Sequence, residues 1–538
     1  MRVLYIVVFA LFIQSFSIAQ EKKPKLVVGI IVDQMRYDFL SRFESRFGDN
    51  GFKRFINEGY QFKNTHYNYI PTKTAPGHAS VYTGTTPFIH GIIANDWYSR
   101  EEGKEIYCAD DHTVKTVGSS NDLGEMSPKN LKTTTITDEL RLSNQFKSKV
   151  VGISIKDRGA IMPTGHSGLA LWFDKKEGGF ISSTFYTDHL PKWVNDFNAK
   201  GLSKKYKNSI WNTKYDISTY VASRHDDEPN ELPLDGLGTK FPYDLSKLDT
   251  NFEPMVHTPY GNQLLTELAL EAIDKAELGE DDFTDFLAIS FSSTDKVGHD
   301  TGPYSVEVED TYLRLDDDLA RIFSKLDEKI GKGNYTVFLT ADHAVSPIPQ
   351  YVLDNKFYAG YFDKVEFLKK INSAISKRFG GDNWAVYDRN NNIYLDHNLV
   401  EDSKYDLSEL RLFVRDQLMK EKGIADVYTS DEIRTFSHAD KGIQGMLARG
   451  FNLKRGGDIV YVLDPFWITP YFDDATAHGS GYTYDTHVPL LWYGKGIIKG
   501  QTTKYHTITQ IAPTISMMLD IALPSGAMSE PLYELLEE

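Results

Sequence analysis

The chain has 538 residues, of which 41% are hydrophobic and 25% are charged, and this balance excludes a mostly disordered or fibrous protein. It carries 59 Lys and Arg against 75 Asp and Glu, so the formal charge is −16 and a nucleic-acid backbone is disfavoured as the main partner. Cys108 is the one cysteine, which excludes an intramolecular disulfide, a Cys-based zinc ribbon and an iron–sulfur cluster. An anionic substrate therefore needs a locally positive site, and metal cations are the natural way to build one in an acidic protein.

The first 19 residues have the pattern of a signal peptide. Arg2 precedes an apolar run over residues 3–13, and Ser17-Ile18-Ala19 forms a small-x-small cleavage site. A buried N-terminal strand or helix is the alternative. No later stretch approaches the ~18 apolar residues of a membrane span, and no cysteine directly follows the run to carry a lipid. We therefore expect a mature chain of residues 20–538 that is periplasmic or secreted, monomeric and without a stable membrane anchor.

Short apolar runs rich in β-branched residues recur along the chain and predict strands buried in a parallel sheet. They cover residues 25–33, 150–155, 286–291, 335–340 and 488–492. Segments with helical periodicity alternate with them, for example at 305–330 and 508–519. The alternation predicts a doubly wound α/β fold, in which ligands bind beyond the carboxyl ends of the strands. We interpret the less regular ranges 159–280 and 350–480 as insertions that cap the sheet.

Carboxylates and histidines lie close to the ends of several of these runs. Taken alone, an Asp-His pair is more often a surface or capping pair than a metal ligand. Joint placement at strand ends favours a metal site, and mixed oxygen and nitrogen ligands without thiolates suit zinc, with manganese or another divalent ion as the alternative. The candidate ligands are Asp33, Asp295, His299, Asp342, His343 and His487.

A threonine also stands at the predicted start of a helix. Residues 70–78 precede this helix, and Pro76 suits its first turn. The Thr74 hydroxyl is then at a helix N-terminus, where free N–H groups and the dipole favour an anion. The local sequence by itself favours a simpler role for Thr74 as the N-cap. His78 is expected to pack or cap on the same helix, and His478 to shape a loop.

These residues together resemble the alkaline phosphatase superfamily, and most closely its PafA-type alkaline phosphatases. The resemblance runs over nearly the whole mature chain and implies a mixed, mostly parallel sheet with helices on both faces. The motifs that carry it are IVDQMRYDF around Asp33, PTKTAPGHASVYTG around Thr74, GIIANDWY around Asn95, SIKDRGAIMPTGH around Lys156 and Arg158, STDKVGHD, TADHA and YDTHVPLLWYG.

The resemblance further implies two zinc ions and a phosphothreonine intermediate. One ion is expected to be held by Asp33, Asp342 and His343 and to bind Thr74 as well. The other is expected to be held by Asp295, His299 and His487. The positions that contact the transferred phosphoryl oxygens are matched by Asn95, Lys156 and Arg158.

The leading hypothesis is therefore a hydrolase of small phosphate monoesters. Its nearest rival is a phosphodiesterase or nucleotide pyrophosphatase on the same fold. Lys156 and Arg158 favour the monoesterase over this rival, because two cations can meet the extra charge of a dianionic monoester. Ordinary ion pairing of these two side chains at a strand end is the alternative. A sulfatase is disfavoured, since Thr74-Ala75-Pro76 has neither its modified Cys or Ser nor its Arg. A non-catalytic metal-binding scaffold is also disfavoured, because such a protein does not need the candidate nucleophile Thr74.

Overall fold

The computed structural model describes residues 23–234, 237–248, 251–469 and 475–536. The predicted signal peptide lies outside these described residues. Within them, no helix is both long and apolar enough to cross a bilayer.

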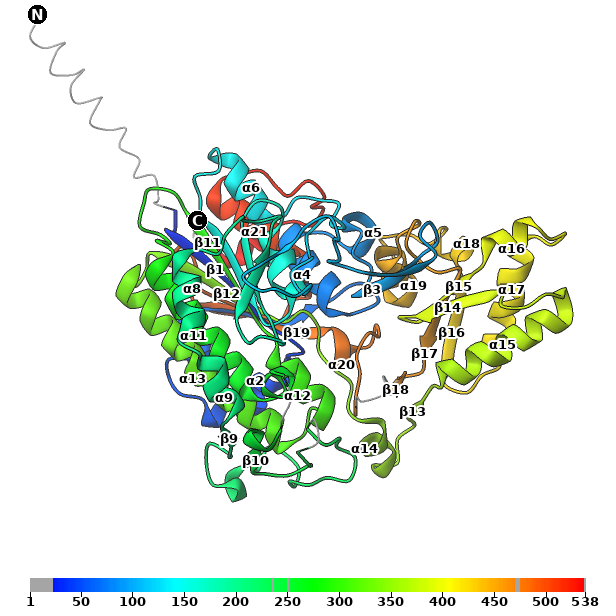
Figure 1. Cartoon of the computed structure of the whole chain (residues 1–538), viewed down its shortest axis with the longest axis horizontal. Helices are drawn as coiled ribbons and strands as arrows, with labels where there is room; N and C mark the ends of the chain where they lie inside the picture. The colour runs from blue at the N-terminus through cyan, green and yellow to red at the C-terminus, as the bar shows by residue number, and fades with distance from the viewer. Residues whose placement is uncertain (1–22, 235–236, 249–250, 470–474, 537–538) are drawn as a thin grey trace, which may run out of the picture.

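A large sheet forms the centre of the molecule, and its middle is parallel (Figure 1). Five neighbouring strands run the same way. In spatial order they are β12 (Tyr335–Thr340), β1 (Leu26–Val32), β11 (Asp285–Phe291), β6 (Val150–Ser154) and β7 (Leu169–Phe173). The first four consist of buried residues throughout, as expected for strands covered on both faces.

Antiparallel strands complete both sides of this sheet. On one side β19 (His487–Gly494) runs antiparallel to β12 and to β2 (Tyr60–His66), and the short strands β20 (Gly500–Thr502) and β21 (His506–Thr507) pair with β2. On the other side β8 (Phe180–Ser183) runs antiparallel to β7 and to β5 (Thr116–Val117). The predicted mixed, mostly parallel sheet is confirmed.

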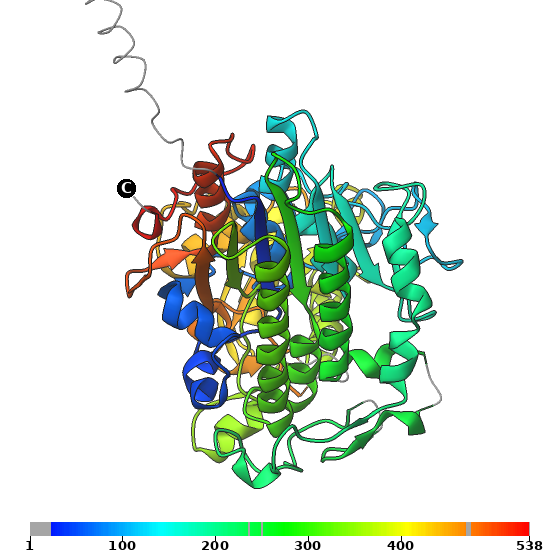
Figure 2. The ribbon, with the colours of Figure 1, turned by 90° about the vertical axis from the view of Figure 1, so that its left-hand side faces the viewer.

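Helices cover the sheet on both faces (Figures 1 and 2). On one face α11 (Pro259–Lys275) and α13 (Val306–Lys329) pack against each other and onto the strands. On the opposite face lie α4 (Thr74–Thr83), α7 (Asp157–Thr164) and α21 (Ile511–Leu519). The arrangement is doubly wound, and it buries the apolar side chains of both sheet faces.

The prediction that residues 159–280 form one capping insertion was wrong at both ends of the range. β7 and β8 belong to the central sheet, and α11 is one of its covering helices. Between them lie short elements: α8 (Lys192–Ala199), α9 (Leu202–Lys207), β9 (Ile210–Trp211) and β10 (Tyr243–Asp244).

The range 350–480 contains a second sheet, which we call the capping sheet. Its strands are all antiparallel, in the order β14 (Ala385–Arg389), β15 (Asn392–Leu395), β17 (Ile459–Leu463) and β16 (Ile424–Thr429). Its helices α15 (Lys364–Phe379) and α17 (Leu407–Leu418) enclose an apolar core of their own. In Figure 1 this unit stands beside the central sheet, on the side of α4.

Candidate active site

The carboxyl ends of the parallel strands bring polar side chains to one edge of the central sheet. Asp33 directly follows β1, Asp342 and His343 come shortly after β12, and Lys156 comes shortly after β6. Asp295 lies in the first turn of α12 (Ser293–Thr301), which follows β11. Because these four strands are adjacent and parallel, their ends converge, and side chains far apart in the sequence meet there.

Asp33, Asp342 and His343 form the first set of candidate ligands. All three are 0% exposed, and His343 Nε2 lies 3.5 Å from Asp33 Oδ1 and 3.7 Å from Asp342 Oδ2. None of these three atoms has a hydrogen-bond partner among the described residues. Burial and the nearby Asp295 carboxylate raise the pKa of Asp33 to about 6, and burial together with Asp33 raises the pKa of Asp342. Buried polar atoms left without partners are costly, and a cation between them removes the cost.

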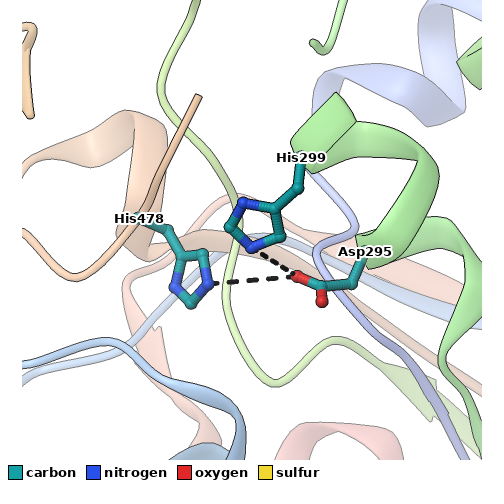
Figure 3. A group of neighbouring side chains, drawn as sticks. All are labelled: Asp295, His299 and His478. Carbon is teal, nitrogen blue, oxygen red and sulfur yellow. Dashed lines mark ion pairs between the residues drawn. The ribbon is translucent and has the colours of Figure 1, made fainter. Parts of the chain in front are cut away.

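Asp295, His299 and His478 form the second set (Figure 3). Asp295 Oδ1 lies 3.2 Å from His299 Nε2 and 3.9 Å from His478 Nε2. The Nδ1 atoms of the two histidines bond to carbonyl oxygens, His299 to that of Thr476 at 2.9 Å and His478 to that of Thr72 at 2.7 Å. A carbonyl only accepts, so each Nδ1 carries the proton and each Nε2 presents a lone pair towards Asp295.

The prediction that His487 completes this second set is corrected by the structure. His487 begins β19 at the expected edge of the sheet, but its ring stacks between Tyr37 and His66, with centroid distances of 4.5 and 4.6 Å. Its Nε2 bonds to the Lys63 carbonyl at 3.0 Å. His66 is also its partner in the strand register, so both rings lie on the same face of the β-ladder.

His478, which we expected only to shape a loop, takes that place. Its ring stacks on His343 with a centroid distance of 3.5 Å and an angle of 11°. Asp485 holds the loop, because its Oδ2 accepts from the Gly479 and Ser480 N–H groups at 3.1 and 2.8 Å. The glycine after His478 is the local signal for this loop in the sequence. In the structure Gly479 has a φ of 129°, which favours glycine. That signal does not say which carboxylate the loop approaches.

Lys156 lies between the two sets. Its Nζ donates to Asp33 Oδ2 at 2.7 Å and to Asp295 Oδ2 at 2.5 Å. Burial raises the pKa of Asp295, but Lys156 and then His299 outweigh burial and lower it. The three aspartates and this lysine leave a formal charge of −3 + 1 = −2 in a buried space. Three carboxylates and three imidazoles without a thiolate are a donor set that fits zinc.

Thr74 is the first residue of α4, and Lys73, not Thr74, is the N-cap. The helix packs closely on the first ligand set, since a Cβ at Gly77 would lie 2.3 Å from the Asp342 carbonyl oxygen. On the same helix His78 Nδ1 bonds to the Thr74 carbonyl at 2.9 Å and its Nε2 to the Ser290 hydroxyl at 2.8 Å. His78 is thus a packed core histidine, and the N-terminus of α4 faces the candidate metal ligands.

Asn95 and Arg158 lie at the same end of the molecule. Asn95 Oδ1 accepts from the Ala75 N–H of α4 at 2.9 Å. The β3–β4 hairpin (Asp96–Ser99, Lys104–Tyr107) then leads to Tyr107, whose hydroxyl accepts from Arg158 Nη1 at 3.0 Å and donates to Asp157. Arg158 Nε is buried without a hydrogen-bond partner in the described part of the chain. Both side chains are therefore held in fixed positions beside the start of α4.

Comparison with known proteins gives three consistent findings. Residues 27–487 match the family model "Type I phosphodiesterase / nucleotide pyrophosphatase". The chain is 45% identical to alkaline phosphatase PafA of Elizabethkingia meningoseptica over 96% of this chain and 95% of that protein, and 44% identical to alkaline phosphatase PhoV of Synechococcus elongatus over 96% and 93%. The crystal structure of wild-type PafA superposes with a TM-score of 0.93 at 44% identity, covering 96% of this chain and 99% of that one.

Proposed function

The chain belongs to the type I phosphodiesterase/nucleotide pyrophosphatase family of the alkaline phosphatase superfamily and is an alkaline phosphatase, and we propose that it acts through a phosphothreonine at a site for two zinc ions. The observation that carries this proposal is that Asp33, Asp342 and His343 each have a buried atom with no hydrogen-bond partner in the described part of the chain, next to helix α4. The substrates are small phosphate monoesters, and the predicted signal peptide supports a periplasmic or secreted location.

Six side chains are proposed to hold the ions. Asp33, Asp342 and His343 hold one, with Thr74 beside it. Asp295, His299 and His478 hold the other. When bound, the ions supply Lewis-acid charge that favours an ionised hydroxyl and stabilises negative charge on the oxygens of the ester.

The side chains of the protein then divide the work of phosphoryl transfer. The Thr74 oxygen loses its proton and attacks phosphorus while the bond from phosphorus to the ester oxygen breaks in line. The ester oxygen leaves with the electron pair and takes up a proton to give the alcohol. Water attacks the phosphothreonine in a second displacement, which returns the Thr74 hydroxyl and releases inorganic phosphate. Positioning and charge stabilisation dominate such reactions. In this proposal Asn95 and Arg158 hold the phosphoryl oxygens beside the N-terminus of α4.

A phosphodiesterase is the second candidate, and the description of the matching family model favours it. Lys156 and Arg158 argue for a monoester. A dianionic phosphoryl group exposes one more charged oxygen than a diester does, and the buried Lys156 and the half-buried Arg158 provide donors for it.

Turnover of a simple aryl phosphate and of the matching diester tests this choice. Purified protein is assayed on both, after treatment with a chelator and again after addition of zinc. We expect the monoester to be hydrolysed faster, with loss of activity in chelator and recovery with zinc. Faster turnover of the diester would contradict the assignment as a monoesterase.

Replacement of Thr74 tests the nucleophile. We expect Thr74→Ala to lose phosphothreonine in acid-quenched samples analysed by mass spectrometry, and to lower kcat by at least ~10³-fold. Thr74→Ser keeps a hydroxyl and serves as the control. Wild-type activity in Thr74→Ala assigns the nucleophile elsewhere.

A further inference from the structure

Gln34 contacts the aspartates of both ligand sets. It is joined to Asp33 by a peptide bond, its backbone N–H donates to Asp342 Oδ1 at 3.2 Å, and its Nε2 donates to Asp295 Oδ1 at 2.8 Å. All of these contacts are buried, and Gln34 itself is 2% exposed. We infer that Gln34 is a positioning residue, which fixes the spacing and orientation of the three carboxylates for two metal ions.

The backbone at Gln34 is arranged for these contacts. Its φ is 66°, in the left-handed region that residues other than glycine rarely adopt. The chain turns there at the end of β1, and the Met35 N–H bonds back to the Val32 carbonyl at 3.2 Å. The turn directs the Gln34 N–H at Asp342 while the side chain reaches towards α12. Strained backbone of this kind persists where the surroundings enforce it, most often at functional sites.

Gly298 provides the space that the Gln34 amide needs. A Cβ at Gly298 would lie 2.0 Å from Gln34 Oε1, which is far inside contact distance. Glycine inside a helix is unfavourable, and Gly298 lies within α12 between the two ligands Asp295 and His299. The amide oxygen therefore sits against the same helical turn that carries two ligands of the second set. This accounts for the glycine of the STDKVGHD segment and for the glutamine that follows Asp33.

A side chain that donates to a ligating carboxylate fixes its orientation, and loss of such a donor lowers metal affinity by roughly 10–100-fold. The inference rests on the proposed two-zinc site. It makes a separate claim, namely that the ligand atoms depend on Gln34 for their arrangement. A merely structural role for the amide would change the free energy of unfolding without changing the affinity for zinc.

Two substitutions of Gln34 separate its amide from its backbone. Gln34→Met keeps the chain length and removes the Nε2 donor. Gln34→Asn keeps an amide and tolerates the left-handed backbone, but it is one methylene too short to reach Asp295. Zinc affinity is measured by competition with a chromophoric chelator, and the ligand field by the visible absorption of the cobalt-substituted protein. We expect both variants to bind zinc roughly 10–100-fold more weakly and to show altered cobalt bands.

Asn372→Leu is the matched control. The Asn372 amide makes two hydrogen bonds with the backbone of Ala385 in the capping sheet and contacts none of the candidate ligands. Its loss removes two partly buried amide hydrogen bonds at a distance from the site. We expect wild-type zinc affinity and a wild-type cobalt spectrum in this variant.

Gly298→Ala displaces the same amide from the other side and serves if Gln34→Met does not fold. We expect it to weaken zinc binding in the wild-type background but to add nothing to Gln34→Ala, because the oxygen that the new methyl group meets is then absent. Wild-type zinc affinity and wild-type cobalt bands in both Gln34→Met and Gly298→Ala would overturn this inference and leave the proposed function unaffected. Wild-type protein that binds no zinc overturns the proposed function as well.

Discussion

Two buried aspartates, one beside the central sheet and one beside the capping sheet, have opposite surroundings. Asp33 at the edge of the central sheet and Asp458 beside the capping sheet are both 0% exposed. One oxygen of Asp33 accepts from Lys156, while the other has no hydrogen-bond partner in the described structure, and the pKa of Asp33 is raised to about 6. Asp458 accepts from Arg100, His397, Arg411 and the Leu395 N–H. Although burial raises its pKa, these donors lower the pKa of Asp458 below its usual range.

The difference separates a structural carboxylate from a functional one. Burial is the same in both places, so burial alone identifies neither. The capping sheet supplies its buried acid with a full set of donors from the protein, as most buried polar groups have. At the edge of the central sheet, one oxygen of Asp33 and one of Asp342 have no donor among the described residues, and a cation would satisfy both.

A large loss of activity is expected when His478, the proposed ligand beside Asp295, is replaced. His478→Ala removes a proposed ligand, and we expect kcat/KM for an aryl phosphate to fall by more than ~100-fold, the upper end for residues that only support a ligand. His487→Ala is the matched control, because His487 lies at the same edge but stacks on Tyr37 and His66. Its kcat/KM should stay within about threefold of wild type. The reverse order of effects would restore His487 as the ligand.

An effect of similar size, which depends on the substrate, is expected from replacing Lys156 or Arg158. Lys156→Ala and Arg158→Ala each remove a proposed donor for phosphoryl oxygens, and we expect kcat/KM for the monoester to fall by roughly 10²–10³-fold. We expect kcat/KM for the diester to fall less, so the ratio of the monoester value to the diester value decreases. An equal loss for both substrates would show that these side chains do not distinguish them.

The capping sheet gives a prediction about stability and pH. Asp458→Asn leaves the half-buried side chains of Arg100 and Arg411 without this buried carboxylate, which we expect to cost about 3 kcal/mol of unfolding free energy at pH 7. The folded pKa of Asp458 is depressed, so its contribution is fully present above the unfolded pKa of about 3.9 and is lost as the pH falls towards the folded pKa. Denaturant unfolding at several pH values measures the difference between wild type and variant. A difference that grows on acidification contradicts the assignment.

Much of the fold could be predicted because the strands that build the site are buried on both faces. β1 and β12 are short, mostly apolar runs, and Asp33 and Asp342, which come just after them, are therefore easy to place. β7 and β8 are short and lie between irregular loops, so residues 159–280 resembled an insertion. Their position in the sheet depends on pairing with β6 across the fold, which local periodicity does not reveal.

The candidate site shows the same limit. Ligands attached to strand ends follow from the strand pattern. His478 lies instead in a loop that is held by Asp485 and by stacking on His343, and these are long-range contacts. His487 stands at the correct edge, but the direction of its side chain depends on the register with His66.

A crystal of the zinc-loaded protein, with diffraction data collected on both sides of the zinc absorption edge, tests the central claim most directly. The account predicts two anomalous peaks. One lies among Asp33, Asp342 and His343 beside Thr74, and the other among Asp295, His299 and His478. A peak at His487, or no peak among the three aspartates, would contradict it.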